Sequence, residues 1–198
     1  MSAPVRPVAI RTKPRAGETG WRVIVLMGVS GCGKTTTGKR LAKALGWPFR
    51  DADEFHPEAN VAKMASGQPL NDEDRAPWLR AIAGWIDVQR MEGHGGIVSC
   101  SALKRAYRDA LIGPARHDVA LVYLKGSKAL IADRLSRRRG HFMPPALLES
   151  QFATLEEPTG DEHPLVVSMR LPPKRVVERV VSGLGLVPAR RVVPAPTA

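Results

Sequence analysis

Cysteine and long apolar runs are both scarce in this sequence. The two cysteines, Cys32 and Cys100, lie far apart, one in a glycine-rich segment and one in an apolar run. This arrangement forms neither a metal-ligand pattern nor a disulfide framework, which favours a reducing compartment. No stretch approaches the ~18 to 20 consecutive apolar residues of a membrane-spanning helix, and the N-terminus lacks the apolar core of a signal peptide. We therefore expect a soluble, cytoplasmic protein with no membrane partner.

Aromatic residues are also few, at 5% of the chain, and this limits how its charge is interpreted. The formal net charge is +11, and basic patches often bind nucleic acid. Five of these excess charges lie in the terminal segments 1–20 and 187–198, which are rich in Pro, Ala and Arg and are expected to be disordered. No aromatic stacking ladder or recognition-helix pattern accompanies the rest. The sequence therefore predicts no nucleic-acid partner, and an ATP-using nucleic-acid protein is kept as the more distant alternative.

Residues 21–186 are predicted to form one α/β domain, because a chain of 198 residues that is 43% hydrophobic can bury one core. Short apolar runs alternate with helical patterns, which predicts a five-stranded, parallel, doubly wound sheet with helices on both faces. Arg50 in the second run indicates an edge strand or a sheet end open to solvent. The predicted strands are 23–27, 49–51, 97–100, 119–124 and 165–168. The predicted helices are 34–45, 57–65, 72–91, 103–111, 127–138, 145–155 and 174–183.

The segment Gly-Val-Ser-Gly-Cys-Gly-Lys-Thr at 28–35 directly follows the first apolar run. This pattern between a buried strand and a helix is typical of the Walker A phosphate-binding loop (P-loop), whose backbone N–H groups surround phosphates. Lys34 is expected to reach the terminal phosphates, and Thr35 to offer its hydroxyl to Mg²⁺. We therefore predict ATP and Mg²⁺ as ligands, with Cys32 as a small side chain in a variable position. The predicted nucleotide contacts in the loop are Gly28, Val29, Ser30, Gly31, Cys32, Gly33, Lys34, Thr35 and Thr36.

Two motifs of other P-loop proteins are absent. The Asn-Lys-x-Asp motif of GTPases does not occur, and no later buried run ends in an acidic residue, as it usually does in large ATPases. The first acidic pair at a strand end is Asp51 and Asp53. Alternate residues of an extended segment point the same way, so both carboxylates can face the ligand-binding edge of the sheet. One would lie near Mg²⁺ and one near an acceptor hydroxyl; alternatively, the pair is only a turn and a helix cap.

Polar residues follow this pair at helical spacing. His56, Asn60, Lys63 and Met64 share one face of a helix that Pro57 can begin. An imidazole, an amide and an ammonium on one face suit a small hydroxylated anion better than a nucleobase. A solvated helix face has the same spacing, so the spacing alone leaves both interpretations open.

Five segments in order resemble the gluconokinase family: 51–60, 63–79, 100–109, 140–144 and 148–158. The resemblance extends over about 23–183. Members of this family are small carbohydrate kinases, related in fold to shikimate and adenylate kinases, which transfer the γ-phosphoryl group of ATP to the 6-hydroxyl of D-gluconate. The resemblance therefore implies a P-loop kinase and D-gluconate as its small-molecule substrate. The nearer alternative is a kinase of this fold for a related sugar acid or shikimate, with other residues tolerated at His56, Asn60 and Lys63.

The resemblance also implies roles for individual residues. Asp51 would orient Mg²⁺ through water, together with Thr35, and Asp53 would hydrogen-bond the acceptor hydroxyl and take its proton. Arg75 and Arg108 are alternative partners for the substrate carboxylate, because a guanidinium can bind it through two parallel hydrogen bonds. The implied catalytic residues are Lys34, Asp53 and Arg138. The implied substrate-binding residues are Asp53, His56, Asn60, Lys63, Arg75 and Arg108.

A small lid is expected at about 138–146. Arg134 and Arg138 are four residues apart, share a helix face, and are similar to the paired lid arginines of adenylate-type kinases. In those enzymes one arginine covers the adenine and the other contacts the transferring phosphoryl group, so both are implied nucleotide contacts here. Closure of such a lid excludes water that would hydrolyse ATP. The sequence does not set the oligomeric state, although a homodimer is one expectation because dimers are common among soluble enzymes.

Overall fold

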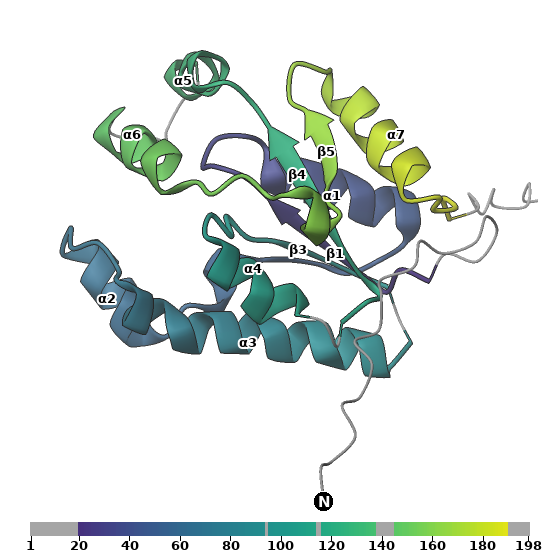
Figure 1. Cartoon of the computed structure of the whole chain (residues 1–198), viewed down its shortest axis with the longest axis horizontal. Helices are drawn as coiled ribbons and strands as arrows, with labels where there is room; N and C mark the ends of the chain where they lie inside the picture. Colours follow the sequence, from purple (N-terminus) through teal and green to yellow (C-terminus); the bar gives the residue numbers. More distant parts are fainter. Residues whose placement is uncertain (1–19, 94, 114–115, 138–144, 190–198) are drawn as a thin grey trace, which may run out of the picture.

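The computed structural model describes residues 20–93, 95–113, 116–137 and 145–189 (Figure 1). Most of both predicted terminal extensions, and most of the predicted lid with Arg138, lie outside the described residues. The chain forms a single five-stranded sheet in the order β2-β3-β1-β4-β5, and every paired strand in it is parallel. Its strands are β1 Val23–Met27, β2 Phe49–Asp51, β3 Gly96–Ser99, β4 Val119–Lys125 and β5 Leu165–Ser168.

The centre of the sheet is β1, and all five of its residues are buried. A strand that is covered on both faces needs this kind of continuous apolar run. β2 lies at one edge, where Arg50 is 41% exposed and its Nε donates to Glu54 Oε2 at 2.5 Å. The expected edge position of Arg50 is therefore confirmed.

Helices cover both faces of the sheet (Figure 1). One hydrophobic core joins α3 and α4 to one face, and a second core joins α1, α5, α6 and α7 to the other. The described α-helices are α1 Lys34–Leu45, α2 Glu58–Ala65, α3 Asp72–Met91, α4 Arg105–Ile112, α5 Lys128–Ser136, α6 Pro145–Thr154 and α7 Pro173–Gly183. Two short 3-10 helices complete the described part, η1 Ala52–Phe55 and η2 Gly160–Glu162.

The predicted doubly wound α/β architecture is confirmed. Each predicted strand is present within one residue of its expected ends, and each predicted helix within two. The sequence did not predict either 3-10 helix. Within the described ranges, we find no helix with the length and apolar character needed to cross a bilayer.

Candidate active site

The P-loop connects β1 to α1 and depends on glycine at its first position. Gly28 has a φ of 142°, and a Cβ on it would lie 2.9 Å from the backbone oxygen of Leu124 on β4. Gly33, the N-terminal cap directly before α1, is left-handed with a φ of 100°. Because residues with a side chain rarely adopt these conformations, glycine at both positions lets the loop backbone approach an anion closely.

Two side chains at the start of α1 face the loop and the neighbouring strand. Lys34 Nζ donates to the backbone oxygens of Gly28 and Val29, at 3.0 and 3.2 Å. Thr35 Oγ1 donates to Asp51 Oδ2 at 2.7 Å. The structure thus brings the predicted phosphate-binding lysine, the predicted metal-binding threonine and the first aspartate to one end of the sheet.

Cys32 occupies the interior of the loop and not its phosphate side. Its side chain is fully buried, and this burial raises the pKa of the thiol above its usual value. Burial also raises the pKa of Cys100 to about 12. Both thiols stay protonated near neutral pH, which agrees with reading Cys32 as a packing residue.

The acidic pair lies at the end of β2, and its two members have different environments. Asp51 is the N-terminal cap of η1, where its Oδ1 accepts from the backbone N–H of Asp53 at 3.4 Å, while Oδ2 binds Thr35. Asp53 is exposed and lines the adjoining cavity, and no described residue donates to its carboxylate. Asp51 is therefore both a helix cap and a partner of the P-loop threonine, and Asp53 is left available to a ligand.

The residues at this end fit a magnesium ion carried by a nucleotide. The Thr35 hydroxyl and the Asp51 carboxylate are hard oxygen donors of the kind that Mg²⁺ prefers. Ser99, which is in register with Asp51, has a buried hydroxyl that no other described atom hydrogen-bonds. No group of three or more His, Cys, Asp or Glu side chains forms an all-protein metal site among the described residues. Mg²⁺ usually binds through one or two protein oxygens, substrate phosphates and waters, which matches this donor set.

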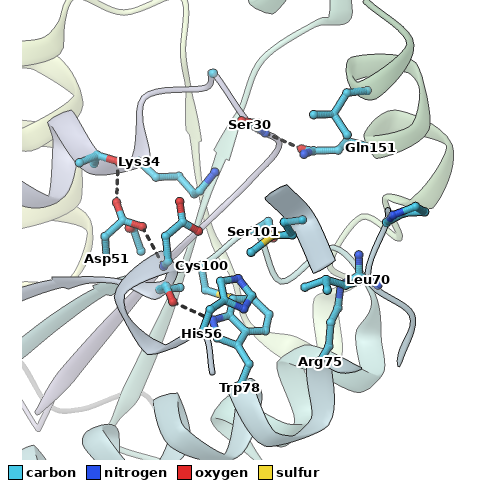
Figure 2. A pocket seen from close by; sticks show the side chains of 18 of the residues that line it. Ser30, Lys34, Asp51, His56, Leu70, Arg75, Trp78, Cys100, Ser101 and Gln151 are labelled. Carbon is cyan, nitrogen blue, oxygen red and sulfur yellow. Dashed lines mark hydrogen bonds between the residues drawn. The ribbon is translucent and has the colours of Figure 1, made fainter. Parts of the chain in front are cut away.

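A cavity of about 750 Å³ continues from the P-loop to the segment between α2 and α3 (Figure 2). Lys34 and Asp51 lie at one end of it, and His56, Arg75 and Trp78 at the other. One continuous space therefore has room for both a nucleotide's terminal phosphates and a small acceptor.

The acceptor end has an aromatic wall and a cationic group. The His56 ring stacks on Trp78, with ring centroids 4.6 Å apart and planes 7° apart. Trp78 Nε1 donates to Ala52 O at 2.7 Å, which fixes this wall to η1. Burial lowers the pKa of His56, although Asp53 opposes the shift, so the imidazole is neutral at pH 7. Arg75 also lines this cavity, with Nη1 3.8 Å from Asp72 Oδ1.

Asn60 and Lys63 lie beside the cavity and are not part of its lining. Asn60 is buried, and its Nδ2 donates to the backbone oxygen of Asp74 at 2.8 Å and lies 3.4 Å from His56 Nδ1. Lys63 Nζ donates to Asp74 Oδ2 at 2.6 Å. Both side chains therefore attach α2 to the start of α3, so we keep them as support for the acceptor wall and not as direct substrate contacts.

Arg108 requires a correction of its predicted contact with the substrate carboxylate. Its guanidinium is 2% exposed and forms two bonds with Glu162, from Nε to Oε2 at 2.5 Å and from Nη2 to Oε1 at 2.9 Å. Nη1 donates to the backbone oxygens of Ala102, Leu103 and Glu156. Arg108 is not among the described residues that line the cavity, so its carboxylate partner is internal and its role is structural.

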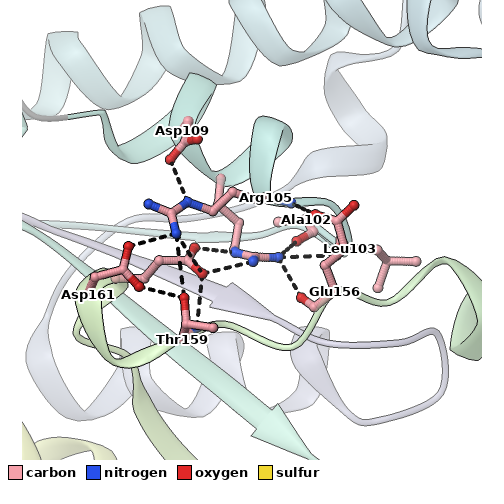
Figure 3. A network of polar contacts seen from close by, with 9 residues as sticks. Ala102, Leu103, Arg105, Asp109, Glu156, Thr159 and Asp161 are labelled. Atoms are coloured by element: carbon pink, nitrogen blue, oxygen red, sulfur yellow. Dashed lines mark hydrogen bonds and ion pairs between the residues drawn. The ribbon is translucent and has the colours of Figure 1, made fainter.

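We predict that Arg108→Met lowers the free energy of unfolding by about 3 to 5 kcal/mol, because it removes the buried guanidinium that forms two charge-assisted hydrogen bonds with the buried Glu162 carboxylate. Urea unfolding followed by circular dichroism measures this change. Arg105→Met in the same network (Figure 3) is the control, with a much smaller expected loss, because the Arg105 side chain is 44% exposed and solvent screens its ion pairs. A loss for Arg108→Met no larger than that of the control would contradict the structural role.

Only part of the predicted arginine pair can be located. Arg134 lies on α5, and its Nη2 donates to the backbone oxygen of Met169, directly after β5. Arg138 belongs to the segment outside the described residues. The predicted contacts of both with the nucleotide stay predictions.

Sequence reasoning missed several polar residues of the cavity, among them Gln151 and Ser99. Gln151 on α6 lines it and accepts a hydrogen bond from the P-loop, and Ser99 contributes its buried hydroxyl. Gln151 lies within the segment 148–158 that carried the resemblance, so a signal for it was present. Ser99 gave none, because an isolated serine at a strand end is common.

A bare P-loop after a buried strand, with an acid on an edge strand and a shared cavity beside both, defines a small P-loop kinase. The shikimate kinase family model matches residues 30–169. A gluconokinase from Gluconobacter oxydans is 50% identical over 160 residues, which cover 81% of this chain and 89% of that protein. The thermoresistant gluconokinase of Escherichia coli is 42% identical over 160 residues, 80% of this chain and 91% of its own length. The chain belongs to the gluconokinase family.

Solved structures agree with this assignment. A gluconokinase from Sinorhizobium meliloti has a TM-score of 0.74 and 44% identity, and the match covers 82% of this chain and 91% of that one. A shikimate kinase from Bacteroides thetaiotaomicron, at 18% identity and a TM-score of 0.59, covers 83% of this chain and 99% of that one and shares the fold.

Proposed function

We propose that this carbohydrate kinase transfers the γ-phosphoryl group of ATP to the 6-hydroxyl of D-gluconate, giving 6-phospho-D-gluconate and ADP. One observation carries the proposal: a single cavity links Lys34 and Asp51 to Arg75 and His56, in a chain that is 50% identical to a gluconokinase. The cytoplasm stays the expected compartment. A homodimer also stays a prediction, which light scattering of the purified protein tests.

Phosphoryl transfer makes little covalent demand on a protein, so the residues act by positioning and charge neutralisation. The P-loop N–H groups and Lys34 bind the phosphates, while Thr35 and Asp51 would hold Mg²⁺, Asp51 through water. When bound, Mg²⁺ offsets the negative charge of the phosphates. Asp53 accepts a hydrogen bond from the gluconate 6-hydroxyl and takes its proton as the new P–O bond forms. Arg138 of the lid is expected to neutralise charge on the moving group.

The acceptor is held at the far end of the cavity. The Arg75 guanidinium binds the gluconate carboxylate through two hydrogen bonds, a geometry that a lysine cannot reproduce. The neutral His56 imidazole offers a hydrogen bond to a sugar hydroxyl without adding charge. Asn60 and Lys63 keep α2, and with it His56, in place against α3.

We predict that Arg75→Ala raises KM for gluconate by about 10- to 100-fold, because a hydrogen bond to a charged group contributes about 1.5 to 3 kcal/mol. KM for ATP should stay within about twofold, since Arg75 lies away from the P-loop. Steady-state kinetics with an ADP-release assay measure both constants. Arg80→Ala is the matched control, because Arg80 lies on the exposed side of the same helix. An unchanged KM for gluconate would remove Arg75 from the acceptor site.

The function itself is tested by an acceptor panel of gluconate, other hexonates, shikimate, nucleoside monophosphates and DNA ends, again with ADP release. We expect gluconate to give the highest kcat/KM. A higher value for another sugar acid or shikimate would favour the nearer alternative. Preference for DNA ends, with binding that falls steeply with salt, would favour the nucleic-acid alternative.

A further inference from the structure

Gln151 of α6 makes a direct contact with the P-loop. Its Oε1 accepts a hydrogen bond from the backbone N–H of Ser30 at 2.6 Å, across 121 positions of sequence (Figure 2). Both residues line the cavity. The contact therefore brings a side chain from the helix that follows the lid to the edge of the phosphate-binding loop.

The chain around Gln151 is fixed to the body of the protein on both sides. Leu148, one turn earlier, is buried in the core. After the helix, Glu156 accepts a hydrogen bond from the backbone N–H of Arg105 at 2.5 Å, and its own N–H donates to Leu103 O at 2.9 Å. Figure 3 shows Glu156 beside Leu103 and Arg105. Glu157 continues this attachment through Lys125, at 2.6 Å. The position of Gln151 is thus set by anchored backbone.

The contact with Ser30 also sets the orientation of the amide. An N–H of the backbone can only donate, so the Gln151 atom that faces it must be the oxygen. The two N–H bonds of Nε2 are then left as donors, and Nε2 has no hydrogen-bond partner among the residues that the structure describes. The cavity therefore has an oriented, uncharged donor next to the phosphate-binding loop.

We propose that Gln151 is a catalytic residue whose Nε2 donates a hydrogen bond to the phosphoryl group during its transfer. The inference rests on the proposed function for the identity of the reaction. The charge on the phosphoryl oxygens changes during the transfer. A hydrogen-bond donor that is already oriented needs no reorganisation in the transition state, so it stabilises the transition state more than the ground state. The Ser30 N–H holds the amide so that no reorientation is needed.

Gln151→Glu tests the donor, because a carboxylate keeps the acceptor for Ser30 but has no N–H. At pH 8 we expect kcat to fall by about 100-fold, the scale of removing one preoriented donor. As the pH is lowered, the introduced carboxyl takes up a proton, regains a donor, and kcat should rise relative to that of the unmodified protein. Gln151→Ala should show a similar loss without this recovery. The pH profile separates a donor from a merely structural residue.

Ser150→Ala is the control, because Ser150 is the exposed neighbour of Gln151 on α6 and should keep wild-type kcat. The proposal is overturned if both Gln151 variants keep kcat within about threefold, if Gln151→Glu shows no recovery at lower pH, or if Gln151→Ala binds ATP more tightly with unchanged kcat. The last result would mean that Gln151 only occupies the phosphate-binding loop and competes with ATP. The variants are measured with the best acceptor of the panel and also in the slow hydrolysis of ATP by water. The result for Gln151 then does not depend on which acceptor the enzyme prefers.

Discussion

Replacing Lys34 with alanine should reduce kcat for phosphoryl transfer by about 10³- to 10⁵-fold, the scale on which a cation at the transferring phosphoryl group contributes. Among the residues that the structure describes, the Lys34 ammonium is bound only to the backbone oxygens of Gly28 and Val29 in the P-loop. A phosphate can therefore take over these contacts without breaking an internal ion pair. Coupled ADP release under saturating ATP and gluconate measures the effect.

Stability should change little in this variant, because two backbone hydrogen bonds of a partly buried side chain contribute about 1 to 2 kcal/mol. Lys39→Ala is the matched control. Lys39 lies on the exposed side of the same helix, so kcat should stay at the wild-type value. Phosphorylation by Lys34→Ala at a normal rate, with Lys39→Ala equally active, would remove the P-loop assignment from the mechanism.

The fold could be predicted because its local signals agree with its packing. The residues of β1 form an uninterrupted apolar run since helices cover both sides of the sheet. α1 ends at Leu45, and Gly46, with a φ of 70°, closes the last turn, as glycine often does directly after a helix. The 3-10 helix η1 was not predicted because it is too short to give a periodic pattern of apolar residues. It depends on the reciprocal cap between Asp51 and Glu54.

The candidate site was only partly predictable because residue type and spacing do not reveal long-range partners. Arg108 has the side chain that a substrate carboxylate would need, yet its partner is Glu162, which is 54 positions away and reaches it only through the fold. Lys63 lies on the expected face of α2, but that face meets Asp74 at the start of α3. In both cases a carboxylate of the protein itself binds the side chain that was predicted to bind a ligand.

Asp51 shows that two interpretations of one residue can both hold. It caps η1, as the structural alternative expects, and it also binds the P-loop threonine, as a metal-site residue would. A cap uses one carboxylate oxygen and leaves the other for Thr35. The sequence alone presented these as alternatives because it does not distinguish the two oxygens.

Replacing Asp53 with asparagine should lower kcat by about 10²- to 10⁴-fold, the range that a positioned general base contributes. Asparagine keeps the size of the side chain and one oxygen acceptor but has no negative charge and cannot take a proton. The Asp53 carboxylate has no donor partner among the described residues, so its substitution breaks no internal hydrogen bond of the side chain. Single-turnover measurement of 6-phosphogluconate formation isolates this step from product release.

The comparison with Asp51→Asn separates the two carboxylates. Asp51→Asn should raise the Mg²⁺ concentration needed for half-maximal rate, because it weakens a hard oxygen donor next to Thr35. Asp53→Asn should leave that concentration unchanged and lower the rate at saturating Mg²⁺. Glu58→Gln, an exposed carboxylate on α2, should change neither quantity. If a high Mg²⁺ concentration restored the rate of the Asp53→Asn variant, Asp53 would belong to the metal site. Another group would then have to accept the proton of the acceptor hydroxyl.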